Sequence, residues 1–174
     1  MYITDFTDEY RRWRLAAEKA IGQVGDDDLN RILAKDGNSI AMLMRHVGGN
    51  LKSRFSDFLT SDGEKPWRDR DSEFDEGPFV RADVRALWDT GWGTLEATLA
   101  SLTDDDFGKT VYIRGQGASV HAQLTRSLSH IANHCGQIII VARVLTSDWQ
   151  WITIPKGKSR EYNQNPIFER PASR

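Results

Sequence analysis

Residues 127–144 read SLSHIANHCGQIIIVARV and place two histidines, His130 and His134, one helical turn apart in a segment that is otherwise largely apolar. The apolar side chains recur at three- and four-residue steps, which predicts an amphipathic helix from near Ser119 to about Thr146. Its packing stripe comprises Leu124, Leu128, Ile131, Ile138 and Ala142. The two histidines lie beside this stripe on a small, polar face, so the helix combines a core surface with a candidate site.

Three more helices are predicted from the same periodicity. The first has its apolar stripe over residues 3–24, and the second, capped by Asn38 or Ser39, has its stripe over residues 40–59. The third spans about residues 81–102. Its inward side chains are expected to be Val84, Leu87, Trp88, Gly91, Leu95, Leu99 and Leu102.

The second helix contains the pair Gly48-Gly49. Each glycine in a helix interior costs about 1 kcal/mol relative to alanine. Such a pair is tolerated where another backbone, or a site, approaches the helix closely. The pair therefore indicates close packing near the middle of this helix.

The remaining segments lack helical periodicity. Residues 60–79 (TSDGEKPWRDRDSEFDEGPF) form a loop longer than most connections, and such loops tend to be functional or disordered. The aromatic side chains Trp67 and Phe74 favour an ordered loop. TVYIRG, at residues 110–115, predicts a small hairpin before the last helix. Residues 147–174 are predicted to be an irregular tail whose first part packs against the body.

Composition and charge exclude several classes of protein. The 174 residues suit a single domain, with a bundle over about residues 2–146 and the tail beyond it. A formal net charge of −2 provides no basic surface for nucleic acid or an anionic membrane. The apolar run IIIVA is too short to span a bilayer, and the N-terminus lacks the apolar core of a signal peptide. The single cysteine excludes an internal disulfide, and together these features predict a cytoplasmic protein.

The histidines have the spacing of metal ligands. Side chains four residues apart on a helix share a face, so His130 and His134 can bind one ion. Ile131 stands where the helical zinc proteases need a glutamate, which excludes that class. His121 lies on the opposite helix face, whereas His46, beside the core stripe of the second helix, is the better third ligand. A single histidine is more often exposed or hydrogen-bonded than a ligand, so the pair carries this interpretation.

Polar residues near the histidines are candidates for supporting contacts. Asn50 and Arg54 continue the face of the second-helix histidine at four-residue steps, and Ser127 and Gln137 share the face of the pair. Each could orient a ligand or contact a substrate; a solvated Arg54 and an Asn50 that faces a backbone carbonyl are the plain alternatives. Cys135 falls in line with the packing stripe, which indicates a small buried hydrophobe rather than a ligand or nucleophile.

Together these features resemble the DinB-like, or YfiT-like, metalloenzymes, and most closely a DinB-related branch labelled as a domain of unknown function. The resemblance rests on NSIAMLMRHVGGNLKSRFSDFLTSDGEKPWRDRDSEF (residues 38–74), LSHIANHCGQIIIVAR (residues 128–143) and, more weakly, IPKGKSREYN (residues 154–163). It implies an all-α four-helix bundle with a long crossover loop after the second helix. It also implies a homodimer, for which the first or third helix, with Trp88 and Trp92, is the candidate face.

The resemblance further implies a divalent ion at His46, His130 and His134, with zinc or nickel favoured and iron or manganese as further candidates. Members of the superfamily include S-transferases that use bacillithiol, mycothiol or glutathione, and a maleylpyruvate isomerase. It therefore implies an S-transferase that acts on small electrophiles with a low-molecular-weight thiol. In this hypothesis Arg54, Lys65 or Arg68 would bind the carboxylates of the thiol. A metal-dependent hydrolase or isomerase and a non-catalytic, metal-binding stress-response dimer remain the alternatives.

Overall fold

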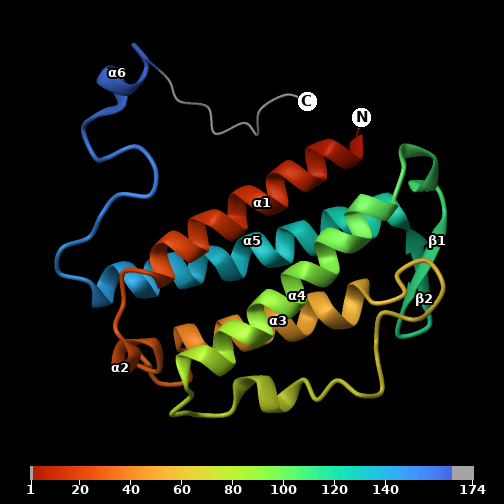
Figure 1. The fold of residues 1–174 in the computed structure, drawn as a ribbon, viewed down its shortest axis with the longest axis horizontal. Coiled ribbons are helices and arrows are strands. Elements are labelled where there is room, and N and C mark those ends of the chain that lie inside the picture. Colours follow the sequence, from red (N-terminus) through yellow and green to blue (C-terminus); the bar gives the residue numbers. More distant parts are fainter. Residues whose placement is uncertain (1, 166–174) are drawn as a thin grey trace.

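The computed structural model describes residues 2–165, and this part of the chain is mostly helical, as the sequence predicts (Figure 1). Four long helices form the body: α1 (Tyr2–Ile21), α3 (Ile40–Phe55), α4 (Arg81–Ser101) and α5 (Val120–Leu145). Four short helical segments accompany them: α2 (Asp26–Leu29), η1 (Asp71–Phe74), η2 (Asp104–Asp106) and α6 (Ser159–Tyr162). The predicted hairpin is present, with β1 (Thr110–Ile113) antiparallel to β2 (Gln116–Ser119).

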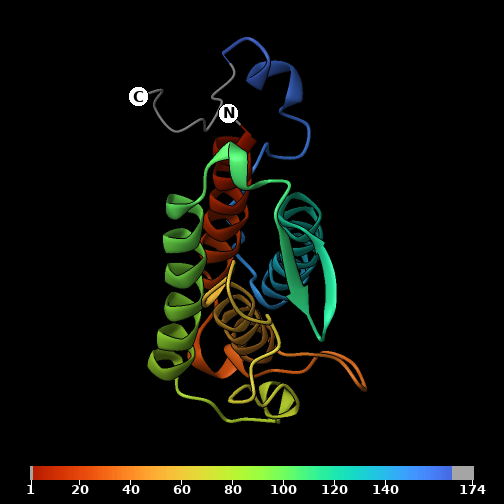
Figure 2. The same cartoon turned by 90° about the vertical axis from the view of Figure 1, so that its right-hand side faces the viewer.

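The long helices pack in pairs, α3 with α4 and α1 with α5, and α3 also contacts α5. The colours in Figure 1 show that α3 and α4 run in the same direction, opposite to α1 and α5. Parallel neighbours cannot be joined by a tight turn. The chain must return along the 16 residues of α3, which extend over about 24 Å. The long connection between α3 and α4 makes this return outside α3, while the hairpin lies beside α5 (Figure 2).

Side-chain caps and backbone geometry set the limits of the two helices that carry the histidines. Ser39 begins α3 by accepting a hydrogen bond from the Met42 N–H at 3.2 Å, and Ser119 begins α5 in the same way. Helix α3 ends at Phe55, earlier than the apolar stripe predicts. The backbone of Asp57 lies in the left-handed region at φ 50°, which a helix cannot continue through.

The packing of α4 confirms one prediction and corrects another. Trp88, expected to point inward, is buried inside the single chain at 0% exposure, and Trp92 is buried at 1%, so these two rings do not form an exposed face for a partner. The Trp88 indole N–H donates to Glu18 of α1 at 3.0 Å. Leu87, expected to point inward, is 48% exposed. It is adjacent in sequence to Trp88, and neighbouring positions on a helix point about 100° apart.

The glycines of α3 and α4 meet each other. A Cβ on Gly48 would lie 2.6 Å from the carbonyl oxygen of Leu87, and a Cβ on Gly91 would lie 2.7 Å from the Cα of Gly48. In both cases the obstacle is backbone, which cannot move aside without separating the helices. The close contact with α4 therefore explains the glycine at position 48. The glycine at position 49 faces the candidate site instead.

This close approach predicts opposite effects for two alanine substitutions on α4. Gly91→Ala is expected to lower the free energy of unfolding by about 2–3 kcal/mol, because the new methyl group overpacks the α3–α4 contact. Gly93→Ala has nothing within 4 Å of its new Cβ and is expected to raise that free energy by about 0.5–1 kcal/mol. Urea denaturation of both variants measures the difference; equal effects would contradict the close approach.

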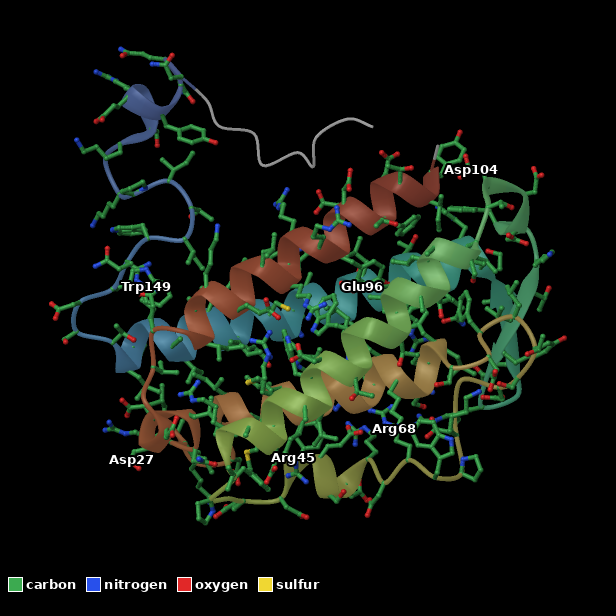
Figure 3. The ribbon with its side chains drawn as sticks, in the orientation of Figure 1. Asp27, Arg45, Arg68, Glu96, Asp104 and Trp149 are labelled. Atoms are coloured by element: carbon green, nitrogen blue, oxygen red, sulfur yellow. The ribbon has the colours of Figure 1, made fainter. Side chains whose placement is uncertain are left out.

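The segment after α5 is only partly packed. Trp149, which lies near the ends of α1 and α5 (Figure 3), and Ile152 contact the core, whereas Trp151 and Ile154 are exposed. The predicted tail therefore packs down at its start, and its last residues, 166–174, lie outside the described part of the chain. Within residues 2–165, no helix combines the length and apolar character needed to cross a lipid bilayer.

Candidate metal centre

Three histidines converge at the contact between α3 and α5. His46 comes from the middle of α3, and His130 and His134 come from successive turns of α5. The His130 Nε2 lies 3.3 Å from the His46 Nε2 and 3.1 Å from the His134 Nε2. One ligand atom from each residue lies within 4.8 Å of the others, so the three could hold one metal ion. His46 is buried, and the other two are half-buried.

The spacing of these nitrogens fits a metal ion. Nitrogens bound to zinc lie about 2.0–2.1 Å from it, so two nitrogens of a tetrahedral site lie about 3.3–3.4 Å apart. The observed separations of 3.1 and 3.3 Å are close to this value. Imidazole also suits nickel and iron, so the donor set does not select among zinc, nickel and iron, whereas manganese prefers oxygen ligands.

The outer nitrogens of two of these rings are already engaged. The His46 Nδ1 lies 2.8 Å from a Glu73 oxygen, and the His134 Nδ1 lies 3.0 Å from the Gln137 amide oxygen. Because both partners are acceptors, each Nδ1 carries the proton and each Nε2 presents a lone pair. Lone pairs that face one another repel unless a cation lies between them. This arrangement, in which an outer partner orients each ligand, is the usual one for metal-binding histidines.

Glu73 is the site residue that the sequence prediction missed. Arg68 donates two hydrogen bonds to its carboxylate, both at 2.8 Å, and the Arg68 side chain is 3% exposed. Figure 3 shows Arg68 between α3 and the loop outside it. A Cβ on Gly49 would lie 2.9 Å from the Glu73 Cδ, so the second glycine of the pair admits this carboxylate. The glycine pair was thus the one sequence signal for a close approach here, although it could not name the partner.

Burial and neighbouring charges keep the site in the protonation state that binds metal. Burial lowers the pKa of His130 to about 4, helped by the charges of His134 and His46. Burial also lowers the pKa of His134, against the raising effect of its hydrogen bond to Gln137. For Glu73, burial would raise the pKa, but the hydrogen bonds from His46 and Arg68 outweigh it and lower the pKa. Near neutral pH the two α5 imidazoles are therefore neutral and the carboxylate is charged.

The predicted helper residues have different roles in the structure. Gln137 orients His134, and Asn50 and Ser127 line a hollow beside the centre. Arg54 lines the same hollow but donates to the Gly63 carbonyl and the Glu64 carboxylate.

Two of the cations expected to bind a thiol are engaged within the protein. Lys65 is buried and hydrogen-bonded to Ser61, and Arg68 is committed to Glu73. The loop folds both side chains back onto the protein, and the binding of a thiol's carboxylates by Lys65 or Arg68 stays a prediction.

The other histidine and the cysteine lie apart from the centre. His121 is exposed and packs its ring near Phe6 and Phe107, as expected for a surface residue at a helix start. Cys135 is fully buried among apolar side chains, and burial raises the pKa of its thiol to about 12. A thiol with this pKa stays protonated near neutral pH, so Cys135 is not a reactive thiolate.

A hollow of about 190 Å³ opens beside His46 and His130. Its walls come from α3, α5, the hairpin and the loop, and Gln123, Phe55 and Phe58 line part of it. A larger hollow of about 550 Å³, between the ends of α3 and α4, contains none of the histidines. The smaller hollow is therefore the one that gives a small molecule access to the centre.

The fold and the site together define a class: helical proteins whose core presents three histidines able to hold one metal ion. The sequence profile of the DUF1572 family, described as proteins of unknown function, matches residues 1–158, and the chain belongs to this family. No curated protein and no solved structure matches the chain.

Proposed function

We propose that this DUF1572 chain is a DinB-like metalloenzyme with a divalent centre at His46, His130 and His134, and that it transfers a small thiol to an electrophile. The observation that carries the proposal is the convergence of three Nε2 atoms beside a hollow that can admit a small molecule. Three protein ligands with open positions are typical of catalytic rather than structural metal sites.

The residues of the chain have separate roles in this proposal. The three imidazoles are the metal ligands, and burial keeps His130 neutral down to acidic pH. Glu73 and Gln137 hold two of the rings in the tautomer that directs Nε2 inward. A bound divalent ion would lower the pKa of a thiol or water and so supply a nucleophile near neutral pH.

Thiol transfer is favoured over hydrolysis because hydrolysis by a metal-bound water is usually assisted by a free general base. The carboxylate that the described structure brings to the histidines is Glu73, and its oxygens already accept from His46 and Arg68. Its lowered pKa also makes it a weak base. A small thiol needs no such base once its pKa has been lowered.

The test compares two reactions of the same protein. Protein loaded with zinc or nickel is incubated with a panel of small thiols that includes glutathione and with a chromogenic aryl halide, and thioether formation is followed by absorbance. A parallel sample without thiol receives a nitrophenyl ester. Thioether formation is expected for the loaded wild type and for His121→Ala, and it is expected to fall to the buffer rate for metal-free protein and for His134→Ala.

The outcomes separate the proposed reaction from its alternatives. Ester hydrolysis that depends on the metal, without thioether formation, would favour the hydrolase. Thioether formation that is equal with and without metal would contradict the proposal, because the histidine centre would then have no part in the reaction.

A further inference from the structure

The hollow beside the histidines is lined by arginines from every element around it. Arg54 comes from α3, Arg68 and Arg70 come from the loop, Arg114 comes from the hairpin turn and Arg126 comes from α5. No carboxylate side chain is among the residues that line this hollow. A concave surface lined by one sign of charge raises the local concentration of ligands of the opposite sign.

Two of these arginines are already bound within the protein. Arg68 makes its paired hydrogen bonds to Glu73, and Arg54 donates to the Gly63 carbonyl at 2.7 Å and to Glu64 at 3.1 and 3.2 Å. Their guanidinium groups hold the loop against α3. They contribute positive charge to the walls but offer few free donors to a ligand.

The other three arginines keep donors free. Arg126 has no hydrogen bond, ion pair or ring contact to any residue between positions 2 and 165. Arg114 uses its Nε to bind Glu64 at 2.9 Å, and its terminal nitrogens have no hydrogen-bond partner within residues 2–165. Arg70 stacks over Phe74 and lies 3.8 Å from Asp71, whose side chain is 99% exposed, so that ion pair is screened by water.

The turn that carries Arg114 is held in place. Its residues Arg114 and Gly115 adopt φ angles of 54° and 71°, the positive values that a two-residue hairpin turn requires. Asp62 of the loop accepts hydrogen bonds from both of their N–H groups, at 2.8 and 2.7 Å. The loop thereby fixes the hairpin turn, and with it Arg114, at the edge of the hollow.

We propose that this hollow binds a small organic anion, whose carboxylate or phosphate group is held by Arg126 and Arg114 while its other end lies beside His46 and His130. Guanidinium groups pair with such oxyanions through two parallel hydrogen bonds. The volume of about 190 Å³ suits a small metabolite. The anion site itself is argued independently of the proposed function. Only the statement that the anion is a substrate of the metal centre rests on that function.

The test measures binding and needs no reaction. Succinate, its neutral analogue succinamide and inorganic phosphate are titrated separately into metal-free wild type, by ligand-observed NMR at constant ionic strength. Saturable binding of succinate or phosphate, but not of succinamide, is expected. The anion that binds more tightly shows whether the site prefers a carboxylate or a phosphate group. Arg126→Gln is expected to weaken binding about 10- to 100-fold, as for the loss of a hydrogen bond to a charged group.

Arg143→Gln is the matched control, because Arg143 lies on the same helix, is exposed and stacks over Trp151 away from the hollow. It removes the same charge and is expected to change the affinity by less than about 2-fold. Binding of neither anion up to about 10 mM, or equal loss in both variants, would overturn the inference.

His130→Ala, titrated in the same way, separates this inference from the proposed function. Anion binding that persists in a variant unable to hold metal would support the inference even if the metal centre failed. Loss of anion binding in Arg126→Gln with unchanged metal content would show that different residues bind the anion and the metal.

Discussion

Substitution of His130 by alanine is expected to remove the metal ion while leaving the fold intact. The His130 Nε2 lies within 3.3 Å of the Nε2 of both other histidines, so it is the central ligand of the three. The variant keeps only the other two. Two ligands hold a divalent ion poorly in water. Protein purified without an affinity-metal step and then exposed to zinc or nickel should contain about one ion per chain in the wild type and almost none in the variant.

The metal-free stabilities give the second readout of this prediction. His130 is half-buried on a helix, and alanine favours helix formation, so circular dichroism should show the same helix content in both metal-free proteins. An ion at 100 times its Kd should stabilise the wild type by about 2.7 kcal/mol and should leave the variant unchanged.

His121→Ala is the matched control, since His121 lies on the same helix and outside the cluster. It should retain the ion. Equal metal content in both variants would place the ion elsewhere, and the absence of an ion from wild type and variant alike would refute the metal centre.

Glu73→Gln is expected to damage both stability and metal affinity. The change leaves the guanidinium of Arg68, which is 3% exposed, without its paired carboxylate. Breaking a buried ion pair costs about 3–5 kcal/mol, and a loss of about 3 kcal/mol is expected because Arg68 also lines the hollow, where water can reach it. The metal affinity should fall about 10- to 100-fold, because Glu73 orients the His46 ring.

Glu76→Gln supplies the control for this change. Glu76 lies three residues further along the same loop and is exposed, so the same chemical substitution should alter the free energy of unfolding by less than about 0.5 kcal/mol. Urea denaturation of the two metal-free variants measures the effect on stability. Competition between each variant and a chelator for the metal ion measures the effect on affinity. Equal stabilities of the two variants would show that the Arg68–Glu73 pair does not hold the loop.

The stability difference between wild type and Glu73→Gln should also depend on pH. The folded-state pKa of Glu73 is lowered below its ordinary value of 4.5, so its stabilising contribution is fully present above that value. The contribution is lost as the pH falls below 4.5 and protonates the folded carboxylate. The two unfolding curves should therefore converge in acid, and a difference that grows in acid would contradict the sign of this shift.

The sequence by itself determined the features that depend on local pattern. Helical periodicity located the long helices and the stripe of α5, because side chains on one helix face recur at fixed steps. The same geometry placed His130 and His134 on one face. The pair Gly48-Gly49 indicated close packing, because glycine inside a helix costs stability that only a close neighbour explains.

Only the tertiary structure decided which groups meet across elements. The loop segment 69–76 holds five carboxylates, four of them at alternate positions, so nothing local distinguishes Glu73, which contacts His46, from its exposed neighbour Glu76. The burial of Trp92, the exposure of Leu87, and the difference between the bound Arg68 and the free Arg126 were likewise decided by packing. These contacts are set when the helices pack and the loop folds back over α3.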